Sequence, residues 1–302
     1  MSDRRVVEVL FTGLVLFLGA ASFHSAVAQE EDPSKGINAE EFIKKRPEAP
    51  TPSSKRTPVR YKRAAKSTSN AATPPPGTTF AQVGVTFWRL RKHTVADKTK
   101  ELIEDEEGTA VEWTPERIEE DTPLYPGQKV RLGIESLSRA GYLYVIDRAQ
   151  YADGTLGEPL LIFPTLKTND LNRVKAGRLI YIPSATGKFT ITPGDSTKNH
   201  VGELVTIIVA AQPLVPSDQL ASKAIRLRRQ QVESWEKQWG AIAARFDMDG
   251  GVGQAMTEKE QAVGSDKSQE LTQDDPPPQT VYRVAIKPEN PILLNVQLKF
   301  HR

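Results

Sequence analysis

The stretch GYLYVIDRAQYADGTLGEPLLIFP, residues 141–164, contains two apolar runs separated by a polar loop. Both runs are rich in Val, Ile, Leu, Tyr and Phe, residue types that are enriched in β-strands. The loop contains the pair Asp153-Gly154, which favours hairpin turns with positive φ, and Gly157 supplies a second permissive position. The stretch therefore predicts a β-hairpin and an antiparallel sheet around it.

Runs of similar composition recur along the chain at hairpin-like spacing. They cover residues 83–91, 129–136, 177–183, 188–192, 203–213, 280–288 and 291–300. In 129–136 and 291–300 apolar and polar residues alternate, which is typical of a strand with one face in the core and one in water. This pattern predicts a mainly β fold over residues 80–302, an antiparallel β-sandwich of the immunoglobulin-like kind.

Residues 217–246 carry a helical pattern instead. Apolar residues recur there at steps of three, four or eight, and Ser217 follows Pro216 as a candidate N-cap. We therefore expect one long amphipathic helix packed on the sandwich. The next residues, 247–278, are dense in Gly, Gln, Asp and Glu and include three consecutive prolines, which predicts a flexible segment.

The N-terminal residues 1–28 have the pattern of a signal peptide. Arg4 and Arg5 precede an apolar run over 9–23, and Ala26-Val27-Ala28 offers a small-x-small cleavage site. An uncleaved anchor is the alternative, although the apolar run is short for a membrane span of about 20 residues. Both interpretations predict export of the folded part to the periplasm, the cell envelope or the extracellular space.

Residues 29–79 are rich in Pro, Ser, Thr, Ala and Lys, and predict a disordered basic tether. The basic residues within 44–66 could bind an anionic cell-wall polymer or membrane surface, and a merely soluble spacer is the alternative. Residues 80–302 carry 28 Lys and Arg against 30 Asp and Glu, so nucleic acid is not an expected partner. The chain contains no cysteine, so its stability cannot depend on disulfides.

The hairpin residues Tyr142, Tyr144, Tyr151, Asp153 and Glu158 form a candidate interaction surface. Tyrosines suit sugar stacking because each offers an aromatic face and a polar hydroxyl group, although strand tyrosines are more often structural. Two carboxylates could share acid and base roles if they lay about 5 to 10 Å apart in a cleft. We favour the structural interpretation, in which Asp153-Gly154 only forms the turn.

The sequence contains only weak indications of metal binding or catalysis. Asp247, Asp249 and Glu258 fall at positions one, three and twelve of a calcium-loop count, but Gly251 and Val252 break the pattern in the middle. We therefore prefer a glycine-rich loop to a metal site. The chain has no nucleophile elbow, no dinucleotide-binding glycine motif and no clustered zinc ligands, so no catalytic residue and no cofactor is expected.

Three segments together resemble a known family. They are TPLYPGQKVRLGIES, the hairpin stretch GYLYVIDRAQYADGTLGEPLLIFP, and NRVKAGRLIYIP. This combination resembles the bacterial domain of unknown function catalogued as number 4384, over residues 122 to about 213, and the C-terminal part looks like the extension of an exported subgroup. The resemblance implies an envelope-located β-rich module without assigned catalytic residues.

These observations predict an exported, non-enzymatic interaction module that binds a protein partner in the cell envelope. A carbohydrate-binding or peptidoglycan-binding protein, or one that processes glycans, is the alternative. It would use the tyrosine and carboxylate residues of hairpin 142–158.

Overall fold

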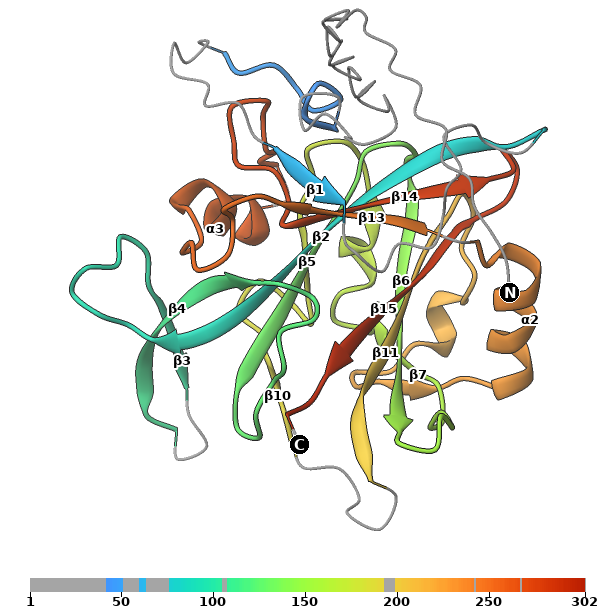
Figure 1. Cartoon of the computed structure of the whole chain (residues 1–302), viewed down its shortest axis with the longest axis horizontal. Coiled ribbons are helices and arrows are strands. Elements are labelled where there is room, and N and C mark those ends of the chain that lie inside the picture. The colour runs from blue at the N-terminus through green and yellow to red at the C-terminus, as the bar shows by residue number, and fades with distance from the viewer. Residues whose placement is uncertain are drawn as a thin grey trace, which may run out of the picture. The chain divides into compact units, whose positions relative to one another are not determined.

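A computed structural model describes residues 42–50, 60–63, 76–104, 108–192, 199–241, 243–266 and 268–301 (Figure 1). The predicted signal peptide and most of the predicted tether lie outside the described residues. The described residues form two antiparallel β-sheets in a sandwich-like arrangement. This confirms the predicted mainly β class, while the immunoglobulin-like topology stays a prediction. No helix in the described ranges is long and apolar enough to cross a membrane.

The first sheet is built around one long strand, β2 (Thr79–Lys92). One edge of β2 pairs with β14 along its first half and with β4 along its second half, and its other edge pairs with β5. The remaining strands extend the sheet on both sides of this centre. The other members are β1 (Tyr61–Arg63), β3 (Glu101–Glu104), β4 (Ala110–Ile118), β5 (Lys129–Ser136), β9 (Ile180–Ile182), β10 (Phe189–Thr190), β13 (Ala243–Met248) and β14 (Thr280–Ile286).

The second sheet contains the predicted hairpin. Its strands follow the order β12-β7-β6-β11-β15, and β8 pairs with β6 beside β7. These strands are β6 (Gly141–Tyr151), β7 (Leu160–Phe163), β8 (Arg173–Val174), β11 (His200–Ala210), β12 (Ile225–Arg226) and β15 (Ile292–Lys299). Strands β6 and β7 pair antiparallel, with Val145 opposite Phe163, so the hairpin prediction is confirmed.

The main core lies between the two sheets. Alternate residues of each strand point into it, because successive side chains of a strand face opposite sides. Val83 and Val85 of β2 and Leu132 of β5 thus belong to the same buried cluster as Val145 of β6 and Ile207 of β11. Apolar burial of this extent is the main stabilising contribution, at about 25 cal/mol per Å².

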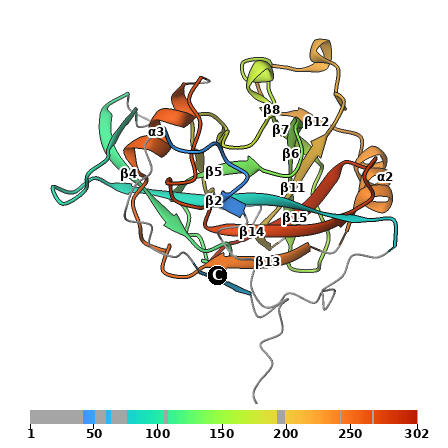
Figure 2. The same cartoon turned by 90° about the horizontal axis from the view of Figure 1, so that it is seen from above.

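The outer faces of both sheets are also covered, and Figure 2 shows the helices α2 (Arg229–Trp239) and α3 (Glu258–Ser265) on opposite sides of the sheets. The water-facing side predicted for strand 129–136 is therefore wrong. Arg131 and Glu135 of β5 are 0% and 1% exposed. The desolvation cost of burying these two charges is offset because Arg131 pairs with Glu101, and Glu135 pairs with Arg46.

The single helix predicted over 217–246 is wrong in extent. Residues Ser217–Gln219 form a short 3-10 turn, β12 follows it, and α2 covers only Arg229–Trp239. The helix ends at Gly240, and the chain then pairs with β14 as strand β13. The predicted apolar stripe is nevertheless real, because Val232, Trp235 and Trp239 pack on the outer face of the second sheet. Beyond residue 240, the backbone forms strand hydrogen bonds with β14 instead of the helical hydrogen bonds that the apolar periodicity predicts.

The flexible segment predicted over 247–278 is also wrong in its described part. Its α3 begins with a capping box between Thr257 and Glu260, and Val263 is buried against the first sheet. The domain also starts before residue 80, since Phe42 is fully buried and β1 pairs with β13. Within the predicted basic patch 44–66, Arg46 is 1% exposed in its ion pair, so it cannot bind an anionic surface.

Candidate functional site

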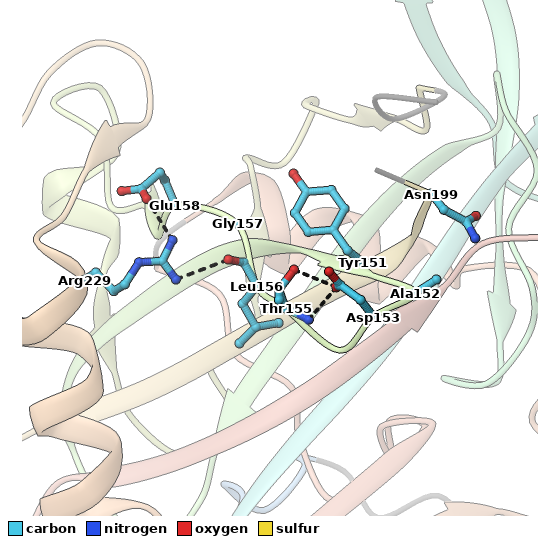
Figure 3. A pocket seen from close by; sticks show the side chains of 9 residues that line it. All are labelled: Tyr151, Ala152, Asp153, Thr155, Leu156, Gly157, Glu158, Asn199 and Arg229. Atoms are coloured by element: carbon cyan, nitrogen blue, oxygen red, sulfur yellow. Dashed lines mark hydrogen bonds and ion pairs between the residues drawn. The ribbon is translucent and has the colours of Figure 1, made fainter. Parts of the chain in front are cut away.

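A groove of about 590 Å³ opens beside the turn between β6 and β7 (Figure 3). We call it the hairpin groove. Most of its lining comes from the turn, and one residue comes from each of two other places, the start of β11 and the first turn of α2. The lining residues are Tyr151, Ala152, Asp153, Thr155, Leu156, Gly157, Glu158, Asn199 and Arg229. Three of the five predicted surface residues, Tyr151, Asp153 and Glu158, therefore lie in one groove.

The turn itself is held by a dense set of hydrogen bonds. Gly154 has a φ of +84°, a conformation that glycine adopts without strain. The Gly154 amide donates to the Tyr151 carbonyl at 3.0 Å, and the Tyr151 amide donates to the Thr155 carbonyl at 3.0 Å. Oδ1 of Asp153 accepts from the amide of Thr155 at 2.8 Å and from its hydroxyl at 2.7 Å. Asp153 thus acts as a turn-forming residue, as the Asp-Gly pair predicted.

Glu158 is also engaged in a contact that fixes the loop. Its Oε1 accepts from an Arg229 guanidinium nitrogen at 2.8 Å, and another guanidinium nitrogen donates to the Leu156 carbonyl at 3.2 Å. Arg229 thereby ties the start of α2 to the hairpin loop, as the dashed contacts in Figure 3 show. The pair is 43% and 48% exposed, so its contribution to stability is small and sensitive to salt.

The environment keeps both groove carboxylates ionised. Hydrogen bonds from Thr155 lower the pKa of Asp153, and the hydrogen bond from Arg229 lowers the pKa of Glu158. A general acid at neutral pH needs the opposite shift, toward 6 or 7. The hairpin groove is therefore suited to binding rather than to proton transfer.

The three tyrosines do not form one stacking surface. Tyr144 is 2% exposed beneath residues that precede α2, and its hydroxyl accepts from the Leu214 amide at 3.0 Å. Tyr142 lies on the same face, with the Arg173 guanidinium 4.3 Å from its ring centre. Tyr151 differs from them in strand parity and lies on the opposite face of β6, beside the His200 ring. A shared sugar platform of these tyrosines is therefore wrong.

The calcium candidates are separated by their roles in the fold. Asp247 belongs to strand β13 and accepts from Arg245 and from Thr280, whereas a calcium loop of this type follows a helix. Asp249 pairs with Lys62 at 2.9 Å, and Glu258 begins α3. The described residues contain no group of three His, Asp or Glu that could hold a metal ion. The weak calcium hypothesis is therefore wrong.

Sequence reasoning missed two residues of the hairpin groove, Asn199 and Arg229. Both are far from residues 151–158 in the chain, and Arg229 falls within the segment 217–246 that the sequence predicts as one long helix. No family model, curated protein or solved structure matches this chain. The resemblance to the bacterial domain family stays a prediction.

Proposed function

We propose that this protein is an exported, non-enzymatic module of the cell envelope that binds a protein partner through the hairpin groove. The observation that carries this proposal is the state of the groove carboxylates, since Asp153 forms the turn and Glu158 holds Arg229. A groove without an available acid or base supports recognition and not turnover.

The form of the hairpin groove favours a macromolecular partner. Small-molecule sites are usually enclosed and largely apolar, with a few polar groups. The hairpin groove is partly open, and six of its nine lining residues have polar or charged side chains, including the exposed Arg229–Glu158 pair. Its loop is already ordered by hydrogen bonds, so the loop would lose little conformational entropy when a partner binds.

Glycan binding is the second candidate, and one observation favours it. Tyr151 lines the hairpin groove together with Asn199 and Arg229, which offer the ring face and hydrogen-bonding groups that sugars use. Glycan processing gains no such support, because neither carboxylate of the groove has a raised pKa.

The test is affinity capture from the envelope extract of the native organism, with the full chain as bait. Three baits are compared: the unaltered chain, Arg229→Glu, and the matched control Lys62→Glu. Lys62 is 73% exposed in an ion pair with Asp249 elsewhere on the domain. Circular dichroism checks that all three baits are folded.

We expect a protein that the unaltered chain and Lys62→Glu retain and that Arg229→Glu loses. Equal retention by Arg229→Glu would place binding outside the hairpin groove and overturn the proposal. Depletion of the bait by insoluble peptidoglycan at high salt, with no protein captured, would favour the glycan alternative. High salt matters because it suppresses nonspecific attraction by the basic N-terminal residues.

A further inference from the structure

A second cavity, of about 220 Å³, lies between the two sheets. Most of its lining residues are apolar, among them Val130 and Leu132 of β5, Val205 of β11 and Leu298 of β15. Polar atoms nevertheless make up about half of its surface. Asp147 and Glu203 are the acidic residues that line it. We call it the acidic cavity, and it shares no lining residue with the hairpin groove.

Strand register brings the two carboxylates together. Asp147 of β6 lies opposite Val205 of β11, and Glu203 is two residues before Val205. Side chains two residues apart on a strand share a face, so Asp147 and Glu203 are diagonal neighbours, with α-carbons about 7 to 8 Å apart. Both side chains point into the core, as that of Val205 does. They are carboxylates on a face whose other core residues are apolar.

Both carboxylates carry an unsatisfied oxygen. Oδ1 of Asp147 and Oε2 of Glu203 are shielded from solvent, and no described residue donates a hydrogen bond to either. The nearest basic group is His200, whose Nε2 lies 3.1 Å from the other oxygen of Glu203. Arg148 adjoins Asp147 in sequence, but it pairs with Glu236 on the outer face of the sheet. Buried polar atoms are nearly always paired, so these two oxygens can accept from a donor that the described residues do not provide.

Burial also changes the charge of this pair. It raises the pKa of Asp147 to about 6. Burial, with the charge of Asp147 nearby, raises the pKa of Glu203 to about 8. Both shifts favour protonation, so near neutral pH the pair carries less negative charge than two ordinary carboxylates would.

We propose that the acidic cavity binds a small primary ammonium compound with an apolar body. The ammonium group donates hydrogen bonds to Asp147 and Glu203, and its hydrocarbon packs against Val205 and Leu298. Three N–H donors on one nitrogen match two diagonal carboxylates. This inference does not depend on the function proposed for the hairpin groove.

The walls and the volume select this class over other cations. A calcium or magnesium ion needs six or more oxygen ligands, whereas the described lining offers two carboxylates and the hydroxyl groups of Thr190 and Thr192. An apolar cavity of about 150 Å³ accommodates benzene, so the acidic cavity fits a ligand of roughly six to eight heavy atoms. Longer polyamines would extend beyond it.

The experiment is isothermal titration calorimetry of the full chain with n-pentylammonium at pH 7. The neutral control ligand is 1-pentanol, which has the same length and lacks the charge. We expect saturable binding of n-pentylammonium with a dissociation constant below about 1 mM, and binding of 1-pentanol at least about tenfold weaker. Equal affinity for the two ligands, or no heat from n-pentylammonium up to about 10 mM, would overturn the proposal.

Variants locate the binding site. Asp147→Asn and Glu203→Gln should each weaken n-pentylammonium binding by about tenfold or more, because each removes a charged acceptor. The matched control is Glu112→Gln, since Glu112 is 42% exposed and pairs with Lys100 on the first sheet. Folded Asp147→Asn and Glu203→Gln proteins that bind as tightly as the unaltered chain would contradict the assignment. The comparison with 1-pentanol on the unaltered chain decides the question even if a variant fails to fold.

Discussion

The outer face of the first sheet carries ion pairs that are almost fully shielded from water. In two of them, Arg46–Glu135 and Arg117–Glu260, neither side chain is more than 3% exposed. In a third, Arg131 donates to both carboxylate oxygens of Glu101, at 2.9 and 2.7 Å. Such pairs add little net stability when intact, but the loss of one partner leaves a buried charge without compensation.

Arg46→Met should therefore destabilise the protein strongly. We expect the free energy of unfolding to fall by about 3 to 5 kcal/mol, because the carboxyl group of Glu135 is left buried without its ion-pair partner. Urea denaturation followed by circular dichroism measures this change. The double variant Arg46→Met with Glu135→Leu should recover much of the loss.

The matched control for this prediction is Lys62→Met, which breaks the exposed pair with Asp249. Exposed pairs contribute about 0 to 1 kcal/mol, so this variant should unfold near the urea concentration of the unaltered chain. Similar losses of unfolding free energy for Arg46→Met and Lys62→Met would show that burial of an ion pair does not determine the cost of breaking it.

The raised pKa values of Asp147 and Glu203 also predict how stability depends on pH. Their folded pKa values of about 6 and 8 exceed the ordinary carboxyl values near 4, so the folded state binds more protons than the unfolded state between pH 5 and 8. Stability then falls as pH rises through this range, by about 1.4 kcal/mol per unit of pKa shift at most.

Urea denaturation at pH 5, 6, 7 and 8 tests this dependence. The double variant Asp147→Asn with Glu203→Gln should flatten the decline, whereas Glu112→Gln should leave it unchanged. The pKa of Glu112 is lowered by Lys100, so its effect on stability appears only under more acidic conditions. A decline of equal slope in the double variant would assign it to other groups.

At the scale of elements, α3 packs unusually close to the first sheet. A Cβ atom built on Gly264 would lie 2.0 Å from a ring carbon of Tyr181, which is 4% exposed in β9. Replacement of a helical glycine by alanine ordinarily stabilises a helix by about 1 kcal/mol. Here the steric contact reverses the expected sign.

Gly264→Ala should lower the melting temperature, as measured by differential scanning calorimetry. Overpacking of this kind costs about 1 to 3 kcal/mol. The control is Ser265→Ala, an exposed position at the end of the same helix, which should change the melting temperature little. A stabilised Gly264→Ala protein would mean that α3 moves away from Tyr181 at low cost.

The sequence predicted those strands whose composition is apolar. The run 129–136 matches β5 residue for residue, and 291–300 contains β15. It missed β4, AVEWTPERI, because the charged residues and the proline of this segment are not typical of a strand. The segment nevertheless pairs with β2 and β3 in the first sheet. It extended α2 too far because periodicity cannot register competition from a partner strand about 40 residues later in the chain.

The candidate sites were predicted unevenly for a similar reason. The turn at Asp153-Gly154 follows from local chemistry, so the sequence was sufficient to predict it. The acidic cavity depends on the pairing of β6 with β11, which no local pattern contains. Glu203 gave one usable signal, since it alternates in phase with Val205 and Ile207 and therefore shares their core-facing side.

At the scale of the whole molecule, the folded domain includes parts of the predicted tether. Phe42 is buried beside Tyr61, and β1 covers the edge of β13. A chain that begins at residue 80 would lose these contacts and leave Glu135 without Arg46. The composition of residues 42–50 and 60–63 does not indicate their role in the fold, because only a few of them are apolar.

We expect the chain 80–302 to be less stable than the chain 29–302 by at least the 3 to 5 kcal/mol of the broken buried pair. It should also aggregate more readily, because the edge of β13 would be exposed for pairing. Thermal unfolding and light scattering at equal protein concentrations measure both effects. Identical melting temperatures for the two chains would restore residue 80 as the start of the domain.

The pairing of β2 with β14 has a consequence for the order of events during synthesis. Thr79 lies opposite Ile286, so the central strand of the first sheet pairs with a strand that follows it in the chain by about 200 residues. A nascent chain can form the hairpin β6–β7 early, but it cannot close this sheet until residues 280–286 have been made. Contacts of such long sequence separation slow folding, so the newly made chain passes through a prolonged, incompletely folded interval.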